Sequence, residues 1–249
     1  MQYYLNHMWS ICKKDFNQFF SSLTGYISIS LFLLINGVFL FILKESSIFD
    51  YGYASLDKFF DLAPWVLLFL VPAISMRSLS EEFKSGTFEI LKTSPVSLLK
   101  IILGKYLSVL LIIILVIAPT IIYSFTIQSL CTSGSIEVGA ICGSYLGLFL
   151  LAATFAAISV CCSGHTSNSV IAFLASAFVC LILYFGCSAL SKLSFFQGNA
   201  DYYIEMFGID FHYRSISRGV LDTRDIVYFI SLVVLALFIT NKKLQTKYK

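Results

Sequence analysis

The stretch MRSLSEEFKSGTFEILKTSPVS, residues 76–97, lies between two long apolar runs and carries charge of both signs more densely than any other part of the chain. Its less polar residues recur at spacings of three and four, the period of one face of an α-helix. That face holds Leu79, Phe83, Thr87 and Ile90. The other face is mostly polar and holds Glu81, Glu82, Ser85, Glu89 and Lys92. The pattern predicts an amphipathic helix along a membrane surface, followed by a helix that enters the bilayer.

Two positions within this stretch predict interruptions of the helix. Gly86 stands in the middle of the pattern, where glycine costs about 1 kcal/mol relative to alanine, so we expect a kink or a break there. Ser94 and Pro95 then have the features of a new helix start. The serine is suited to the N-cap, and the proline to the first helical position, where its missing N–H is not needed.

The composition predicts an all-α, polytopic membrane protein. Apolar residues make up 58% of the 249 residues, charged residues only 12%, and the mean hydropathy is +0.85. A soluble protein has roughly twice that share of charged residues. The longest polar segment, residues 191–225, leaves no room for a soluble catalytic domain. We therefore expect a single transmembrane domain over residues 1–249.

Six apolar segments are candidates for membrane-spanning helices, for which a bilayer core requires about 20 residues. They cover residues 24–43, 62–76, 98–127, 138–162, 169–190 and 226–240. An amphipathic N-terminal helix precedes the first and is expected to lie in the membrane interface. In the third span, Pro119 is expected to produce a kink, and Lys100 and Lys105 are expected to reach back to the membrane surface. Residues 191–225 are expected to form an outer interfacial or re-entrant segment.

The basic residues predict the orientation of the chain in the membrane. With six spans and the N-terminus inside, 11 of the 17 lysines and arginines fall in inner segments. Inner segments of membrane proteins carry the excess of Lys and Arg, so both termini are expected in the cytoplasm. The same topology places residues 77–92 in the cytoplasm, where a soluble partner can reach them.

A stripe of small residues runs along the fourth span. Gly139, Gly143 and Gly147 recur at four-residue spacing. Small side chains on one face let another helix approach closely. The stripe is therefore expected to be a packing face, either for another helix of this chain or for a second copy in a dimer.

The sequence contains no residue pattern that indicates catalysis, a metal or a bound cofactor. Neighbouring residues on a helix diverge by about 100°, so Glu81 and Glu82 are expected to form a solvated charged face and not a metal pair. His7, His165 and His212 lie in three separate segments, whereas a metal site needs clustered ligands. The P-loop motif for ATP is absent from the sequence. We expect no catalytic, metal or cofactor site, no enzyme activity and no nucleic-acid partner.

The charged stretch resembles a motif of the permease subunits of type-two ABC exporters. The resemblance rests on Arg77, Glu81, Glu82, Gly86, Thr87, Glu89, Leu91, Thr93, Pro95 and Ser97, followed by Gly104 and Lys105. The six-span plan, the amphipathic N-terminal helix and the polar segment before the last span extend it over nearly the whole length. Residues 19–27 and 211–222 look most like the gliding-motility permease of Bacteroidota.

The resemblance implies that this chain works with a separate ATPase. In that family, the cytoplasmic helix after the second span docks into a cleft of an ABC ATPase. Carried over by position, the ATPase-coupling residues are Arg77, Glu81, Glu82, Lys84, Gly86, Thr87, Glu89 and Pro95. The resemblance further implies the bacterial inner membrane as location, and a second permease copy or a related membrane subunit as partner.

The sequence permits two interpretations of the outer segment and two of the function of the whole chain. In the family, the outer segment caps the transport pathway; its counterparts here are Phe211, His212, Tyr213, Arg218 and Asp222. A plain interfacial belt of aromatic residues is the alternative.

For the whole chain, the alternative to an exporter subunit is a non-transporting membrane scaffold of a motility or secretion complex. An exporter predicts transport driven by a partner ATPase, and a scaffold predicts stable assembly without turnover.

Overall fold

Helices account for nearly all of the structure. The computed structural model describes residues 2–43, 56–93, 96–130, 138–192 and 199–247. No strand occurs among these residues. Six helical stretches within them are long and apolar enough to cross a membrane. The predicted class, an all-α polytopic membrane protein with six spans, is confirmed.

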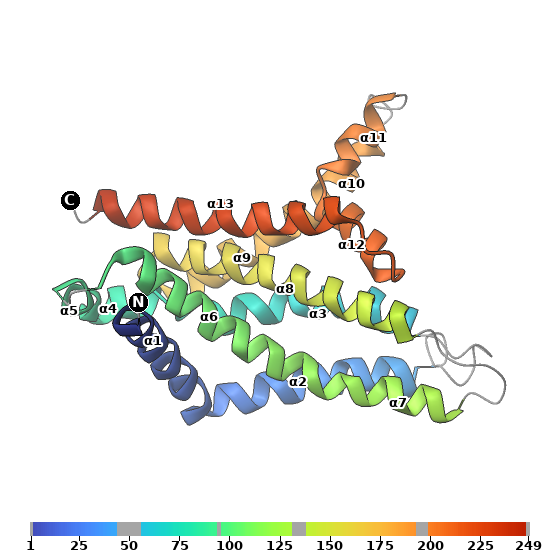
Figure 1. The fold of residues 1–249 in the computed structure, drawn as a ribbon, viewed down its shortest axis with the longest axis horizontal. Helices are drawn as coiled ribbons and strands as arrows, with labels where there is room; N and C mark the ends of the chain where they lie inside the picture. Colours follow the sequence, from blue (N-terminus) through green and yellow to red (C-terminus); the bar gives the residue numbers. More distant parts are fainter. Residues whose placement is uncertain (1, 44–55, 94–95, 131–137, 193–198, 248–249) are drawn as a thin grey trace.

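The candidate spans run back and forth along the bundle, so that both termini lie at one end (Figure 1). We call this the terminal end and the opposite one the far end. The elements before the fourth span are α1 (Gln2–Ser21), α2 (Leu23–Phe41), α3 (Asp57–Ser75), α4 (Ser80–Ser85), α5 (Thr87–Thr93), α6 (Leu98–Ile117), η1 (Ala118–Thr120) and α7 (Ile121–Leu130). They are followed by α8 (Val138–His165), α9 (Ser169–Leu181), the π-helical η2 (Ile182–Gly186), α10 (Cys187–Ser191), α11 (Asn199–Met206), α12 (Ile209–Ser217) and α13 (Thr223–Lys247).

The helix α8 is at the centre of the bundle. It packs against α3, α6, α9, α12 and α13, and every residue from Leu151 to Val160 is buried. Many of these residues are alanines, whose small side chains let the neighbouring helices approach closely. The peripheral helices α2, α9 and α13 instead leave large apolar side chains exposed, such as Leu34, Phe178 and Leu235. Exposed apolar faces of this kind suit contact with lipid.

The helices extend or divide several of the predicted spans. The helix α3 begins at Asp57 and not near residue 62; the acidic residue in its first turn is favourable beside the helix dipole but hides the helix from a hydropathy pattern. At Pro119, where a kink is expected, the third span changes from α-helix to the 3-10 turn η1. The helix α13 continues to Lys247, because nothing in its polar tail ends a helix and basic residues are favourable near its C-terminus.

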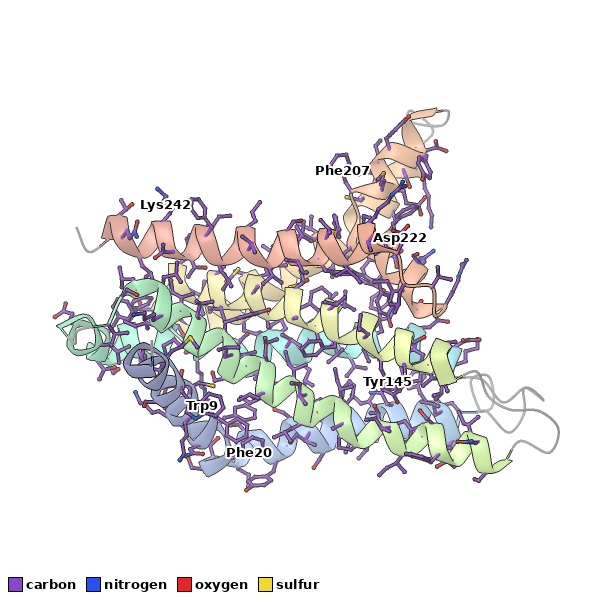
Figure 2. The ribbon with its side chains drawn as sticks, in the orientation of Figure 1. Trp9, Phe20, Tyr145, Phe207, Asp222 and Lys242 are labelled. Carbon is purple, nitrogen blue, oxygen red and sulfur yellow. The ribbon has the colours of Figure 1, made fainter. Side chains whose placement is uncertain are left out.

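Aromatic side chains join three helices near the far end. Tyr145 of α8 lies inside the bundle (Figure 2), with its ring centroid 5.1 Å from that of Phe60 in α3. The ring of Phe59 lies 5.9 Å from Tyr123 of α7. The hydroxyl of Tyr145 donates to the carbonyl oxygen of Thr120 at 2.9 Å, next to the break in the third span. Edge-to-face ring contacts and this hydrogen bond fix the far end of the bundle.

Candidate functional site

Residues 77–93, which we call the α4–α5 element, lie at the terminal end (Figure 1). The break predicted at Gly86 is present, because this glycine ends α4 with a left-handed φ of 70°. Across the break, the rings of Phe83 and Phe88 meet edge to face at 4.8 Å, and Phe88 is buried. The element is thus two short helices held at a fixed angle by an aromatic contact.

The base of the α4–α5 element is tied to α8 by one serine. The Oγ of Ser163 accepts hydrogen bonds from the backbone N–H groups of Leu79 and Ser80, both at 3.0 Å. The same hydroxyl donates to the carbonyl oxygen of Met76 at 3.1 Å. The N–H groups of a first helical turn have no partner within their own helix. Ser163 supplies that partner, and no pattern in the sequence indicates this role.

A buried ammonium group links the element to two other helices. Nζ of Lys105 in α6 lies 2.9 Å from Oε1 of Glu82 in α4 and 3.0 Å from Oδ2 of Asp15 in α1. It also donates to the carbonyl oxygen of Ser78 at 2.6 Å. The side chain of Lys105 is 1% exposed, against 11% for Glu82 and 16% for Asp15. We call Lys105, Glu82, Asp15 and the Ser78 carbonyl the Lys105 cluster.

The Lys105 cluster uses the full donor capacity of the lysine. An ammonium group has three N–H donors, and three acceptors surround this one. Burying a charge is costly unless it is paired and hydrogen-bonded, and both conditions are met here. The cluster therefore fastens α1, α4 and α6 to one another at the terminal end.

Two expectations about these residues are wrong. Lys105 does not reach to the membrane surface but points into the bundle. Glu82 does not belong to a solvated charged face, because it is buried against Lys105. The physical reason is the same for both: an opposite charge from a distant segment makes burial of each one favourable.

The unexpected partner in the cluster is Asp15, and the sequence carries a signal for it. Asp15 shares the helical spacing of the apolar residues Ile11, Cys12 and Phe19, and an acid on an apolar face indicates a buried counter-charge. Gly104 permits the contact, because a Cβ there would lie 3.0 Å from the Met8 carbonyl oxygen of α1. The pair Gly104-Lys105 thus combines close helix approach with the charge that Asp15 needs.

The remaining coupling residues lie on the outside of the α4–α5 element. Exposed side chains are those of Arg77, Glu81, Lys84, Thr87 and Glu89, and Gly86 is exposed as well. Their charges are of both signs. Pro95 lies outside the described residues. The element therefore has an inner side held by Glu82 and an outer side available to a partner.

The glycine stripe of α8 packs against the outer segment. A Cβ on Gly147 would lie 2.6 Å from Cγ2 of Ile216 in α12, and one on Gly143 would lie 3.2 Å from Cα of Gly219. The Oγ of Ser144, between them, donates to the carbonyl oxygen of Ser217 at 2.8 Å. Around Gly139 there is open space. Two of the three glycines therefore let α12 and the residues after it pack closely against α8.

Each of the outer-segment residues has a defined place at the far end. Tyr213 is buried and its hydroxyl donates to the carbonyl oxygen of Phe60 at 2.6 Å. Asp222 lies at the start of α13 (Figure 2), where Oδ1 accepts from the backbone N–H of Arg224 at 2.9 Å. The ring of Phe211 meets Tyr202 of α11 edge to face, and Arg218, which ends α12, is exposed.

His212 is buried between two acceptors. Its Nδ1 lies 2.6 Å from Oδ1 of Asp225, its Nε2 lies 2.9 Å from the carbonyl oxygen of Met206, and its ring stacks on Tyr228. Both ring nitrogens therefore have a polar partner within the structure. His212 therefore joins α12 to the first turn of α13, and no cluster of metal ligands occurs in the described parts of the chain.

Comparison with known proteins agrees with this architecture. A family model described as "ABC-2 family transporter protein" matches residues 44–207. This range includes α3 to α11 and with them the whole α4–α5 element. No curated protein matches the chain. Since the family match covers well over half of the sequence, the chain belongs to the ABC-2 family of transporter proteins.

Proposed function

We propose that the chain is the membrane-spanning permease subunit of an ABC exporter. In this proposal it couples ATP hydrolysis by a separate cytoplasmic ATPase to export, or to a motility or secretion machine. The observation that carries the proposal is the two-sided α4–α5 element, with Glu81, Lys84 and Glu89 exposed and Glu82 held inside. Membership of the ABC-2 family supports an ABC ATPase as the partner in general.

In this proposal, the contacts of the α4–α5 element transmit movement of the ATPase to the membrane-spanning helices. A partner that shifts α4 acts on α1 and α6 through the Lys105 cluster, and on α8 through Ser163. Coupling requires that closure of the ATPase favour one arrangement of the helices over another. Helices fastened at one end by ion pairs and hydrogen bonds can move together as rigid bodies. The chain itself supplies no catalytic chemistry in this scheme.

The proposed setting is the bacterial inner membrane, with both termini in the cytoplasm. The excess of Lys and Arg at the terminal end supports this orientation, and the ABC-2 family supports a multi-pass membrane protein. A second permease copy or a related membrane subunit completes the proposed transporter. The exposed apolar faces of α2, α9 and α13 are available for such a contact.

Co-purification from membranes tests the coupling proposal. The wild-type chain is expected to recover a P-loop ATPase, identified by mass spectrometry. The double variant Glu81→Arg/Glu89→Arg is expected to recover about tenfold less or lower still, because like charges would then face the partner. Lys242→Glu, an exposed charge reversal on α13 at the same end of the bundle, is the matched control and is expected to retain the ATPase.

The outcome of that experiment also separates the exporter from the scaffold. Loss of the ATPase from the double variant, with unchanged elution in size-exclusion chromatography, supports docking through the α4–α5 element. Absence of an ATPase from the wild type, in a membrane assembly that remains intact, favours a non-transporting scaffold of a motility or secretion complex.

A narrower proposal is that the chain serves gliding motility. It rests on the resemblance of residues 19–27 and 211–222 to the gliding-motility permease of Bacteroidota. The second of these segments forms most of α12 and its junction with α13. Deletion of the gene in its own host tests this role, which is rejected if the deleted strain spreads on agar like the parent.

A further inference from the structure

A cavity of about 250 Å³ opens at the far end, between the last turns of α2 and the first turns of α3 (Figure 1). Its lining combines aromatic rings, leucines and two charges of opposite sign. The described lining residues are Phe39, Leu40, Lys58, Asp61, Leu62 and Trp65. A mostly apolar cavity with a few polar groups is typical of a site for a small molecule. This one shares no residue with the α4–α5 element or the Lys105 cluster.

The carboxylate in this cavity has no partner among the described residues. Asp61 is exposed, and it forms neither an ion pair nor a hydrogen bond with any residue that the structure describes, Lys58 included. It lies in the second turn of a helix that is long and apolar enough to cross a membrane. Acidic side chains in such helices are rare and mark functional sites. The cavity therefore has a place for a cation beside Asp61.

An aromatic ring lies one helical turn from this carboxylate. Trp65 follows Asp61 by four residues, which places both on the same face of α3, and its side chain is 47% exposed. The ring centroid of Phe185 in η2 lies 4.2 Å from that of Trp65 and holds the indole in place. The face of an indole attracts cations more strongly than the other aromatic rings do. Asp61 and Trp65 thus both favour a positive charge in the cavity.

The lining favours a quaternary ammonium over a primary one. A primary ammonium has three N–H donors, and each donor that leaves water needs a new acceptor. Among the described lining residues, only Asp61 has a charged side-chain acceptor, since Lys58 and the indole of Trp65 only donate and the others are hydrocarbon. A trimethylammonium group has no N–H to satisfy, and its methyl groups suit contact with leucine and phenyl side chains.

The same face of α3 has a place for a hydrocarbon chain. Phe69 follows Trp65 by four residues and is 51% exposed. Asp61, Trp65 and Phe69 therefore form a row that runs from the far end towards the middle of the span. A ligand whose cation is bonded directly to an alkyl chain matches this order. Phosphatidylcholine does not, because its phosphate lies between the choline and the chains and would be held against apolar side chains.

We propose that this cavity binds a lipophilic quaternary cation, an amphiphile with a trimethylammonium group bonded directly to an alkyl chain. The cation lies between the carboxylate of Asp61 and the indole of Trp65, and the alkyl chain lies along Phe69. The proposal concerns binding by this chain alone, and it is independent of the proposed exporter function and of any ATPase.

Equilibrium dialysis of the purified full-length chain in dodecyl maltoside tests this proposal, with empty micelles as the reference. The probes are dodecyltrimethylammonium and protonated dodecylamine, which have the same chain length and the same charge. The quaternary probe is expected to bind about tenfold more tightly, because the primary ammonium loses water without gaining enough acceptors. Diheptanoyl phosphatidylcholine at equal concentration is expected not to displace it. Equal binding of the two probes, or displacement by this phospholipid, would overturn the proposal.

Two variants locate the binding in the cavity. Asp61→Asn keeps the shape of the side chain and removes its charge, and Trp65→Leu removes the ring. Each is expected to weaken binding of dodecyltrimethylammonium about fivefold. Asp222→Asn serves as the control and is expected to change nothing, since Asp222 is an exposed aspartate at the far end that does not line the cavity.

Tryptophan fluorescence gives an independent location. The sequence has two tryptophans, Trp9 and Trp65, so Trp9→Phe leaves Trp65 as the sole indole. Binding of dodecyltrimethylammonium is expected to change the emission of Trp9→Phe and to leave that of Trp65→Leu unchanged. A change confined to Trp65→Leu, or undiminished binding in both Asp61→Asn and Trp65→Leu, would show that the cation binds elsewhere.

Discussion

The variant Lys105→Met is expected to be the most destabilising single change at the terminal end. It leaves the carboxylates of Glu82 and Asp15 side by side and largely buried without their shared cation. Removing one partner of a buried ion pair costs about 3–5 kcal/mol. For a chain of this size that corresponds to a melting temperature lower by about 6–20 °C. Thermal unfolding in detergent, followed by size-exclusion chromatography, measures the change.

A triple variant separates lost charge pairing from lost packing. In Lys105→Met/Glu82→Met/Asp15→Asn the remaining side chains are neutral and of similar length. Replacing a whole buried ion cluster by neutral groups is often close to neutral in stability, so most of the melting temperature is expected to return. A triple variant that melts as low as Lys105→Met would show that the shape of the lysine, and not its charge, holds α1, α4 and α6 together.

The second large effect is expected at Gly219, where α12 leads into α13. Its φ is +82°, and a Cβ there would lie 2.6 Å from Cα of Ala140 in α8. Gly219→Ala combines a left-handed backbone, which costs about 1–2 kcal/mol without glycine, with an overpacked contact that costs about 1–3 kcal/mol. We expect a total loss of about 2–5 kcal/mol. Hydrogen exchange in α12 is expected to become faster, because the packing of α12 against α8 is weakened.

Gly139→Ala is the matched control for this position. It is another glycine at the far end, but nothing lies within 4 Å of the place that its new methyl group would take. Its effect is expected to stay within about 0.5 kcal/mol. If the alanine at Gly219 is tolerated equally well, then the contact between Gly219 and α8 does not hold the outer segment in place.

Much of the fold follows from properties that are local in the sequence. The six spans depend on length and apolar content, and six candidate spans are present. The break at Gly86 depends on one residue's backbone freedom, and the break at Pro119 on one missing N–H and a rigid ring. The start of α3 differs from the prediction because Lys58 and Asp61 make its first turns too polar for a hydropathy pattern.

The parts that could not be predicted depend on contacts between distant segments. Lys105 and Asp15 are 90 residues apart. The place of Asp15 on an apolar face indicates a buried counter-charge, but nothing in the sequence indicates that Lys105 supplies it. The same holds for Ser163 with Leu79 and for Gly147 with Ile216. The stripe of glycines indicated close packing, but the choice between a helix of the same chain and a second copy required the position of α12.

The Lys105 cluster has a consequence for the order in which the chain is made. Synthesis proceeds from the N-terminus, so Asp15 and Glu82 both leave the ribosome before Lys105. The lysine therefore has its two counter-charges available when its own helix enters the bilayer. His212 is in the opposite situation, because Asp225 follows it at the start of the last span. The Lys105 cluster can thus be assembled while the chain is still growing, whereas the contact of His212 with Asp225 is completed only when the final helix is made.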